Sequence, residues 1–110
     1  MSEWAGSSAL ALARAIQDKT ISSSELLEYF VERYERLNPE INAIVATNLD
    51  QARKAAADAD EALARGEILG PLHGLPMTLK DNLQIIGMPT TYGSEALAEY
   101  MPDSNADVAQ

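Results

Sequence analysis

One lysine stands out in the second half of the sequence. Lys80 is the only lysine or arginine after Arg65, and it follows the apolar stretch Pro76-Met77-Thr78-Leu79. Catalytic groups often lie where a strand gives way to a loop, and a buried amine can lose its proton and then act as a base toward a hydroxyl group. Most lysines, however, are solvated surface groups. From the residues alone, Lys80 is therefore either a general base or a surface charge.

The other reactive side chains are few. His73 is the only histidine and there is no cysteine, so the sequence offers neither a thiolate metal site nor the ligands of a zinc site. A lone histidine can act as a general base, and here it lies between a Gly-Pro turn and Gly74. Trp4 and Tyr92 carry no pattern that indicates a site.

The composition and net charge of the chain limit the classes of protein to which it can belong. The 110 residues include 46% hydrophobic and 23% charged residues, as in one ordinary globular domain. The net charge of -9 argues against direct binding of nucleic acid. No apolar run approaches the length of a membrane helix, and the start MSEWAGSS lacks the features of a secretory leader. These observations predict a cytoplasmic protein.

Three helices are predicted in the first 65 residues. Over residues 8–19, a face formed by Leu12, Ala13 and Ile16 predicts a short amphipathic helix that Ser7 or Ser8 caps. Ser22 and Glu25 have the spacing of a capping box that opens a second helix. Its predicted apolar stripe is Leu27, Phe30, Tyr34 and Leu37, and Asn38-Pro39 is expected to end it.

The third helix is predicted over residues 49–65. Its stripe is Ala52, Ala56, Ala59 and Leu63, and Gly66 is expected to form a left-handed cap. Three acidic residues, Asp58, Asp60 and Glu61, are expected on the solvated face. A metal site there is the weaker alternative, because Asp58 and Asp60 point in different directions on a helix.

The remaining segments are predicted as short strands, turns and helix starts. Residues 41–47, rich in β-branched side chains, predict a buried strand, and residues 77–79 a short second one. Residues 66–110 hold most of the glycines and prolines and are predicted to be rich in loops. Ser94 is expected to cap a short helix over residues 95–99, and another helix is expected to begin within residues 103–110.

An ordered set of short motifs runs from Gly70 to Ser94, GPLHGLPMTLKDNLQIIGMPTTYGS. It includes Gly-Pro-Leu-His-Gly-Leu-Pro, Lys-Asp-Asn and Gly-Met-Pro-Thr-Thr, and it closely resembles the amidase signature family. The resemblance extends over about residues 7–110 and includes the Leu-Asn-Pro and Ile-Asn-Ala stretches. It implies an α/β fold with a mixed sheet covered by helices, and a hydrolase of carboxylic amides.

The resemblance also implies a mechanism and assigns residues to it. The family uses a Ser–cis-Ser–Lys triad, in which Lys80 corresponds to the lysine. Asp81 and Asn82 are expected to orient the loop and tune the lysine, and Thr90, Thr91 and Gly93 to shape the loop. Ser94 corresponds to neither catalytic serine, so a turn or cap role is expected for it. No metal or organic cofactor is implied. Because the base in this motif block is the lysine, a structural hydrogen-bonding role is expected for His73.

The chain contains no Gly-Gly-Ser-Ser-Gly-Gly-like run, in which the family carries both triad serines. Residues 1–110 are therefore expected to be the N-terminal fragment of a single amidase domain, inactive alone. Within it, residues 7–65 are predicted as a helical layer with one strand, and residues 66–110 carry the lysine. In the complete enzyme, we expect Lys80 to be buried and neutral.

Three functions stay open. The first is a stand-alone amidase for a small-molecule amide, and the second is the A subunit of a glutamyl-tRNA amidotransferase, which shares these motifs. The third is a non-catalytic helical interaction module. The expected partners are the amide substrate and either a second copy of the chain or the absent C-terminal part of the domain, with no membrane and no direct contact to nucleic acid.

Overall fold

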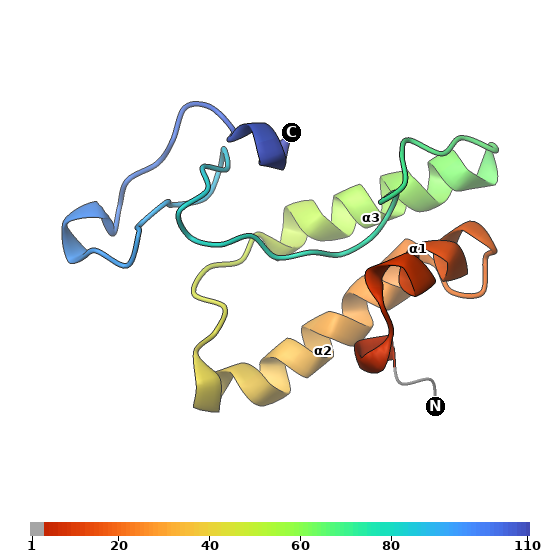
Figure 1. Cartoon of the computed structure of the whole chain (residues 1–110), viewed down its shortest axis with the longest axis horizontal. Coiled ribbons are helices and arrows are strands. Elements are labelled where there is room, and N and C mark those ends of the chain that lie inside the picture. Colours follow the sequence, from red (N-terminus) through yellow and green to blue (C-terminus); the bar gives the residue numbers. More distant parts are fainter. Residues whose placement is uncertain (1–3) are drawn as a thin grey trace. The chain divides into compact units, whose positions relative to one another are not determined.

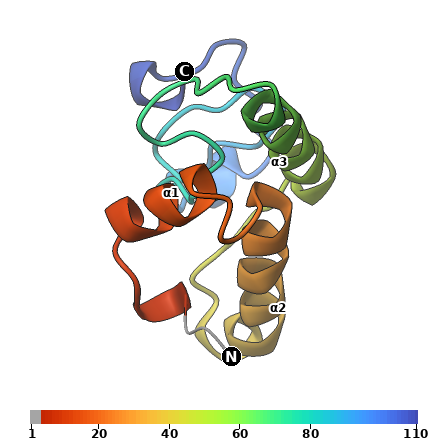
Figure 2. The ribbon, with the colours of Figure 1, turned by 90° about the vertical axis from the view of Figure 1, so that its right-hand side faces the viewer.

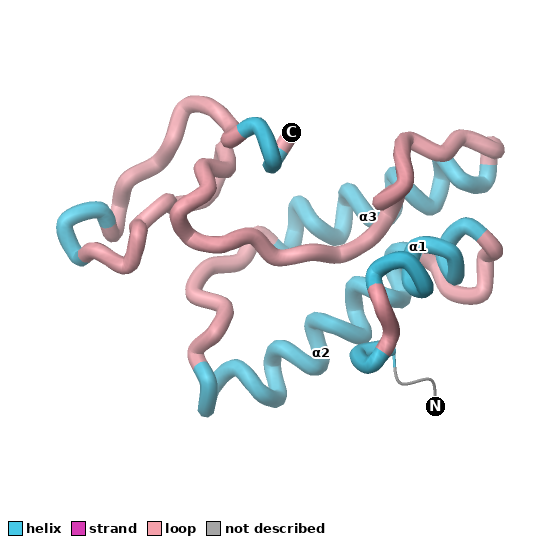
Figure 3. The backbone as a smooth tube through the Cα atoms, viewed as in Figure 1, coloured by secondary structure: helices cyan, strands magenta, loops and turns pink. Residues whose placement is uncertain are grey.

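A computed structural model describes residues 4–110, and its regular structure is helical (Figures 1 and 3). Three α-helices, α1 (Ala9–Gln17), α2 (Ser23–Ile41) and α3 (Leu49–Ala64), confirm the three predicted helices. Single 3-10 turns form η1 (Trp4–Gly6), η2 (Glu95–Leu97) and η3 (Asp107–Ala109). The chain divides into a first unit, Met1–Ala43 with Leu49–Pro76, and a second unit, Ile44–Asn48 with Met77–Gln110.

The core of the first unit forms where α1 meets α2. The Ser8 side chain accepts a hydrogen bond from the Ala11 amide at 3.2 Å and so caps α1 as predicted. Leu12 and Ile16 of α1 and Leu26 of α2 form the buried cluster. Other side chains pack against it from the rest of the unit: Trp4, Ile21, Phe30, Leu63 and Leu75. Burial of these apolar groups is the main stabilising contribution in this unit.

Helix α2 begins as predicted but ends later. Both hydrogen bonds of the capping box are present: the Ser22 amide donates to Glu25 Oε2 at 2.9 Å, and the Glu25 amide donates to Ser22 Oγ at 3.0 Å. The prediction that Asn38-Pro39 ends the helix is wrong, because Pro39 lies inside it. Proline removes one amide donor, and Asn42 supplies the C-terminal cap beyond it, with a left-handed backbone that asparagine tolerates.

The predicted apolar stripe of α2 is confirmed only in part: Phe30 packs against the core cluster, but no residue of the stripe is fully buried. The buried residues are Ser23, Leu26 and Val31, all in the first half of the helix, and Leu37 is exposed. This half packs against both α1 and α3, so its buried surface faces two neighbours rather than one. Apolar residues that recur with one helical repeat mark a single face of a helix, so they do not predict a surface that is buried against two neighbours.

Helix α3 confirms the small-residue stripe in part: Ala56 and Ala59 are buried as predicted, whereas Ala52 and Leu63 are only half-buried. Ala56, Ala59 and Ala62 are buried, and α3 lies beside α2 (Figure 2). Its end is a Schellman motif: the Gly66 amide donates to the Leu63 carbonyl at 3.0 Å, and the Glu67 amide to the Ala62 carbonyl at 2.9 Å. Gly66 has a φ of 78°, as its predicted capping role requires.

The two predicted strands are absent from the part of the chain that the structure describes. Residues 42–48 and 75–80 have no regular secondary structure, so the sheet of the expected α/β class is not seen within residues 4–110 (Figure 3). β-Branched side chains favour extended backbone, but a strand exists only when a partner accepts and donates its ladder hydrogen bonds. No segment among residues 4–110 supplies that partner.

The second unit consists of turns joined by a few hydrogen bonds. The Thr90 amide donates to the Tyr100 carbonyl at 2.9 Å, and the Ala106 amide to the Gln84 carbonyl at 2.8 Å. Ser94 precedes η2, but its side chain makes no capping hydrogen bond, contrary to the prediction. The predicted start of a helix after residue 103 is limited to the single turn η3. Side chains add further hydrogen bonds: the Ile86 amide donates to Asn105 Oδ1 at 2.8 Å, and the Gln84 side chain donates to the Tyr100 hydroxyl at 3.2 Å.

Candidate functional site

Lys80 opens a turn in the second unit. Its carbonyl accepts a hydrogen bond from the Leu83 amide at 3.0 Å, so Asp81 and Asn82 form the bend. The side chain of Lys80 is exposed and, among residues 4–110, makes no hydrogen bond or ion pair. The strand expected directly before it is not formed. The amine is therefore presented to solvent from a loop.

Asp81 fixes this turn to Thr91. Its Oδ1 atom accepts a hydrogen bond from the Thr91 amide at 2.9 Å, and its Oδ2 atom accepts one from the Thr91 hydroxyl. The Asp81 carbonyl also accepts the Tyr92 amide at 3.0 Å. Hydrogen bonds to a carboxylate favour its charged form, so those from the Thr91 hydroxyl and amide lower the pKa of Asp81.

The hydrogen bonds between Asp81 and Thr91 predict how the pKa of Asp81 and the stability of the chain respond to pH. Replacing Thr91 with valine removes the hydroxyl donor, so the pKa of Asp81 is expected to rise toward its ordinary value of 3.8. In the wild-type chain the Asp81 pKa is lowered on folding. The contribution of this pair to stability is therefore complete above pH about 4 and is lost as pH falls through the lowered value. NMR titration of the Asp81 carboxyl carbon measures the shift, and an unchanged pKa in Thr91→Val would contradict it.

The other predicted loop-shaping residues lie around this pair. Thr90 is 1% exposed. The Gly93 amide donates to the Thr91 hydroxyl oxygen at 3.2 Å, and the Ser94 amide donates to the Thr91 carbonyl at 2.8 Å. Gly93 has a φ of 70°, which a tight turn here requires. The structure thus brings Asp81, Thr91, Gly93 and Ser94 together by hydrogen bonds, whereas no such bond joins the side chains of Lys80 and Asn82 to them.

His73 lies in the first unit and has the predicted structural role. It is 5% exposed, and both ring nitrogens meet backbone groups. The Leu69 amide donates to Nδ1 at 3.1 Å, which places the ring hydrogen on Nε2, 2.9 Å from the Ala59 carbonyl oxygen. The ring therefore ties the loop after α3 back to α3.

Asp60 corrects one prediction made from the sequence. Instead of lying on a solvated face, it is half-buried and accepts three hydrogen bonds from the start of α2. Its Oδ1 atom accepts the Ser23 amide at 2.7 Å, and its Oδ2 atom accepts the Ser24 amide at 3.0 Å and the Ser24 hydroxyl at 2.7 Å. A carboxylate at a helix N-terminus satisfies free amides and meets the positive end of the helix dipole.

Gly74 contacts Ser23 at the same N-terminal end of α2. Its carbonyl accepts the Ser23 hydroxyl at 2.5 Å, and its φ is +72°. A Cβ atom at position 74 would lie 3.1 Å from Ser23 Cβ. We call the contacts among Ser23, Asp60, His73 and Gly74 the α2–loop network. It holds α2, α3 and the Gly-Pro-Leu-His-Gly segment together.

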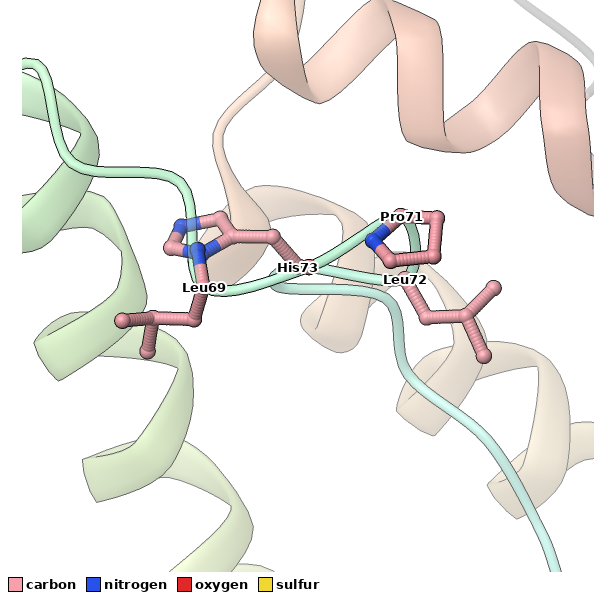
Figure 4. A pocket seen from close by; sticks show the side chains of 5 residues that line it. Leu69, Pro71, Leu72 and His73 are labelled. Atoms are coloured by element: carbon pink, nitrogen blue, oxygen red, sulfur yellow. The ribbon is translucent and has the colours of Figure 1, made fainter.

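The loop that carries His73 also lines an open hollow. Its lining residues are Leu69, Gly70, Pro71, Leu72 and His73, and Figure 4 shows the His73 ring on the α3 side with Leu72 pointing away from it. Leu69 is 79% exposed and Leu72 is 53% exposed. Lys80 is not among the lining residues, so the hollow does not contain the candidate base.

Two features of the described residues are not predicted from the sequence: the backbone conformation of Tyr92 and the contacts of Asp60. Tyr92 has a left-handed backbone with a φ of 53°, although no sequence pattern assigns it a role. Its place directly before Gly93, in a Thr-Tyr-Gly-Ser turn, is the one local signal that points to it. Asp60 escapes prediction because its partners lie more than 30 residues away.

Two features that would indicate other functions are absent from residues 4–110. Among residues 4–110 there is no cluster of three or more histidine, cysteine or acidic side chains that could hold a metal ion. No helix in that part of the chain is long and apolar enough to cross a membrane. What remains is an accessible amine on a turn that a carboxylate and a threonine hold in place.

Comparison with curated proteins identifies similar sequences. The chain is 38% identical over 101 residues to an acylamidase of Rhodococcus erythropolis, covering 92% of the chain and 21% of that protein. It is 42% identical over 95 residues to the A subunit of the glutamyl-tRNA(Gln) amidotransferase from Synechococcus sp. strain CC9605, covering 86% of the chain and 19% of that protein. The chain thus spans about a fifth of the length of these relatives.

Solved structures and the family profile agree with these sequences. The native peptide amidase of Stenotrophomonas maltophilia matches with a TM-score of 0.85 and 32% identity, over 93% of this chain and 21% of that one. A bacterial aryl acylamidase of the amidase signature family matches with a TM-score of 0.81 and 31% identity, over 92% of this chain and 20% of that one. The profile described as Amidase matches residues 25–110. The chain belongs to the amidase family, that of the amidase signature enzymes.

Proposed function

We propose that this chain supplies the catalytic lysine of an amide hydrolase that works through a Ser–cis-Ser–Lys triad. Lys80 is the base, and the two serines come from a segment outside residues 1–110. The mixed sheet of the fold, in which the 41–47 and 77–79 segments find partners, is part of the same proposal. So are a small-molecule amide as substrate, a cytoplasmic location, and no direct contact with nucleic acid.

In the proposed reaction, the amine of Lys80 takes the proton of one serine, which takes the proton of the second. The second serine oxygen attacks the amide carbonyl carbon, and the C–N bond breaks as the leaving nitrogen receives the proton. Water then hydrolyses the acyl-serine ester by the same route. Asp81 and Thr91 keep the turn in place, and Asn82, Thr90, Gly93 and Ser94 complete the loop around it.

The observation that carries this proposal is the Lys80 turn. Lys80 lies in the ordered motif block, six residues after Gly74, and precedes a carboxylate that two hydrogen bonds from Thr91 hold. Loops that present a reactive group from a defined backbone geometry are common in active sites. Membership of the family and the similarity to acylamidases and peptide amidases support an amide as the substrate.

A second candidate is the A subunit of a glutamyl-tRNA amidotransferase. The 42% identity to one such protein is the observation that favours it. In that case the amide is the side chain of glutamine and the product is ammonia. Ammonia release from glutamine, compared with release from acyl amides by the full-length protein, separates the two candidates.

The 110-residue chain alone is expected to hydrolyse no amide, because it lacks the run that holds both triad serines. The measurement is ammonia release from benzamide, acetamide and glutamine by the purified chain. The proposal that both triad serines lie outside residues 1–110 would be contradicted by ammonia release above the buffer blank, if a serine-directed phosphonate inhibitor abolishes that release.

A further inference from the structure

Tyr92 has an unfavourable backbone conformation. Its φ of 53° lies in the left-handed region, where Cβ crowds the following carbonyl oxygen in any residue other than glycine. Lys19 and Asn42 are the other residues among 4–110 with this feature that are not glycine, and Tyr92 is the only aromatic one. A bulky side chain in this conformation persists only where the surrounding structure or a function maintains it.

The Tyr92 side chain makes no hydrogen bond or ring contact that would offset this cost within residues 4–110. It is 55% exposed, and within residues 4–110 its hydroxyl makes no hydrogen bond and its ring contacts no other ring. The hydroxyl of Tyr100, by contrast, accepts a hydrogen bond from Gln84 at 3.2 Å. Hydrogen bonds and ring contacts of the side chain inside the described chain therefore do not explain a tyrosine at position 92.

The backbone around Tyr92 is fixed directly beside the candidate base. The Tyr92 amide donates to the carbonyl of Asp81, the residue after Lys80, at 3.0 Å. Thr91 binds the Asp81 carboxylate through its amide and its hydroxyl. These three hydrogen bonds hold the Tyr92 backbone against the Lys80 turn, within one unit of the structure.

We propose that Tyr92 is a specificity-determining residue, whose ring forms a contact surface for an aryl group of the substrate beside Lys80. This inference rests on the proposed amide hydrolase. The phenol ring is uncharged and presents a flat apolar face, so it favours another ring over a small aliphatic or charged group.

The test compares Tyr92→Gly and Tyr92→Phe in the full-length protein. Glycine removes both the ring and the strain, whereas phenylalanine keeps the ring. Lys19→Gly is the matched control, because it relieves the same backbone conformation at a φ of 58° in the turn after α1. The substrates are benzamide and acetamide, and benzamide binding is measured separately by saturation-transfer NMR.

Tyr92→Gly is expected to lower kcat/KM for benzamide about tenfold and to leave that for acetamide within about twofold, since a ring contact accounts for a difference of this order. Tyr92→Phe and Lys19→Gly are expected to match the wild type. Equal changes for both substrates, or none, would overturn the inference. If neither amide is hydrolysed, the proposed function fails. Benzamide binding then still tests Tyr92: if Tyr92→Gly binds benzamide as well as the wild type does, the proposed ring contact is excluded.

Discussion

Replacing Lys80 with methionine is expected to lower the rate of amide hydrolysis by roughly a thousandfold, the middle of the range for loss of a general base. Methionine keeps the approximate length of the side chain and removes the amine. A suitable host is a chimera in which this chain replaces the matching segment of the Rhodococcus erythropolis acylamidase, because the host supplies the remaining four-fifths of an amidase. The measurement is kcat/KM for an acyl amide in the chimera with and without the substitution.

Lys54→Met is the matched control for this prediction. Lys54 is an exposed lysine on α3 whose ammonium pairs with Asp58 at 2.6 Å, outside the candidate site. It is expected to leave kcat/KM within about twofold, since exposed ion pairs contribute little. Lys80→Arg is expected to be as inactive as Lys80→Met, because a guanidinium stays protonated. A Lys80→Met chimera that kept a tenth of the activity would refute the assignment of the base.

Replacing Asp60 with alanine is expected to destabilise the chain by about 3 kcal/mol, because hydrogen bonds to a charged group contribute about 1.5–3 kcal/mol each and the remaining donors regain part of this from water. The carboxylate accepts hydrogen bonds from the amides of Ser23 and Ser24 and from the Ser24 hydroxyl. Its loss leaves these donors without a partner at the start of α2. Urea unfolding followed by helical circular dichroism measures the change.

Asp58→Ala is the control for this substitution, in the same helix and two residues away. Asp58 is exposed and contacts Lys54 four residues earlier, so its loss is expected to shift the unfolding midpoint far less than the loss of Asp60 does. Asp60→Asn keeps an oxygen acceptor without the charge and is expected to fall between the two. Equal midpoints for Asp60→Ala and Asp58→Ala would show that the hydrogen bonds of the Asp60 carboxylate contribute nothing to stability.

Features of the fold that depend on neighbouring residues can be predicted from the sequence. The capping box of Ser22 and Glu25, the cap by Ser8 and the left-handed Gly66 each depend on residues within four or five positions of one another. Such patterns contain all the atoms that form the hydrogen bonds, so the sequence is sufficient to identify them. The Lys80 motif is recognisable for a similar reason, since its parts follow one another in order.

Features that depend on distant partners cannot be predicted in the same way. Asp60 has the pattern of a surface charge, because its three donors lie 36 or 37 residues earlier. The 41–47 segment has the composition of a strand, but composition cannot supply the neighbour that a strand requires. Pro39 is a weaker helix terminator than expected, because proline near the end of a helix removes only one hydrogen bond.

The contact between Ser23 and Gly74 restricts which sequences this fold accepts. The two residues are 51 positions apart, yet each limits the size of the other: a side chain at position 74 would press on Ser23 Cβ, and a larger residue at position 23 would press on the Gly74 backbone. A variant with a bulkier residue at position 23 therefore has no compensating change at position 74, because glycine cannot become smaller. Directed evolution of this protein should explore these two positions last.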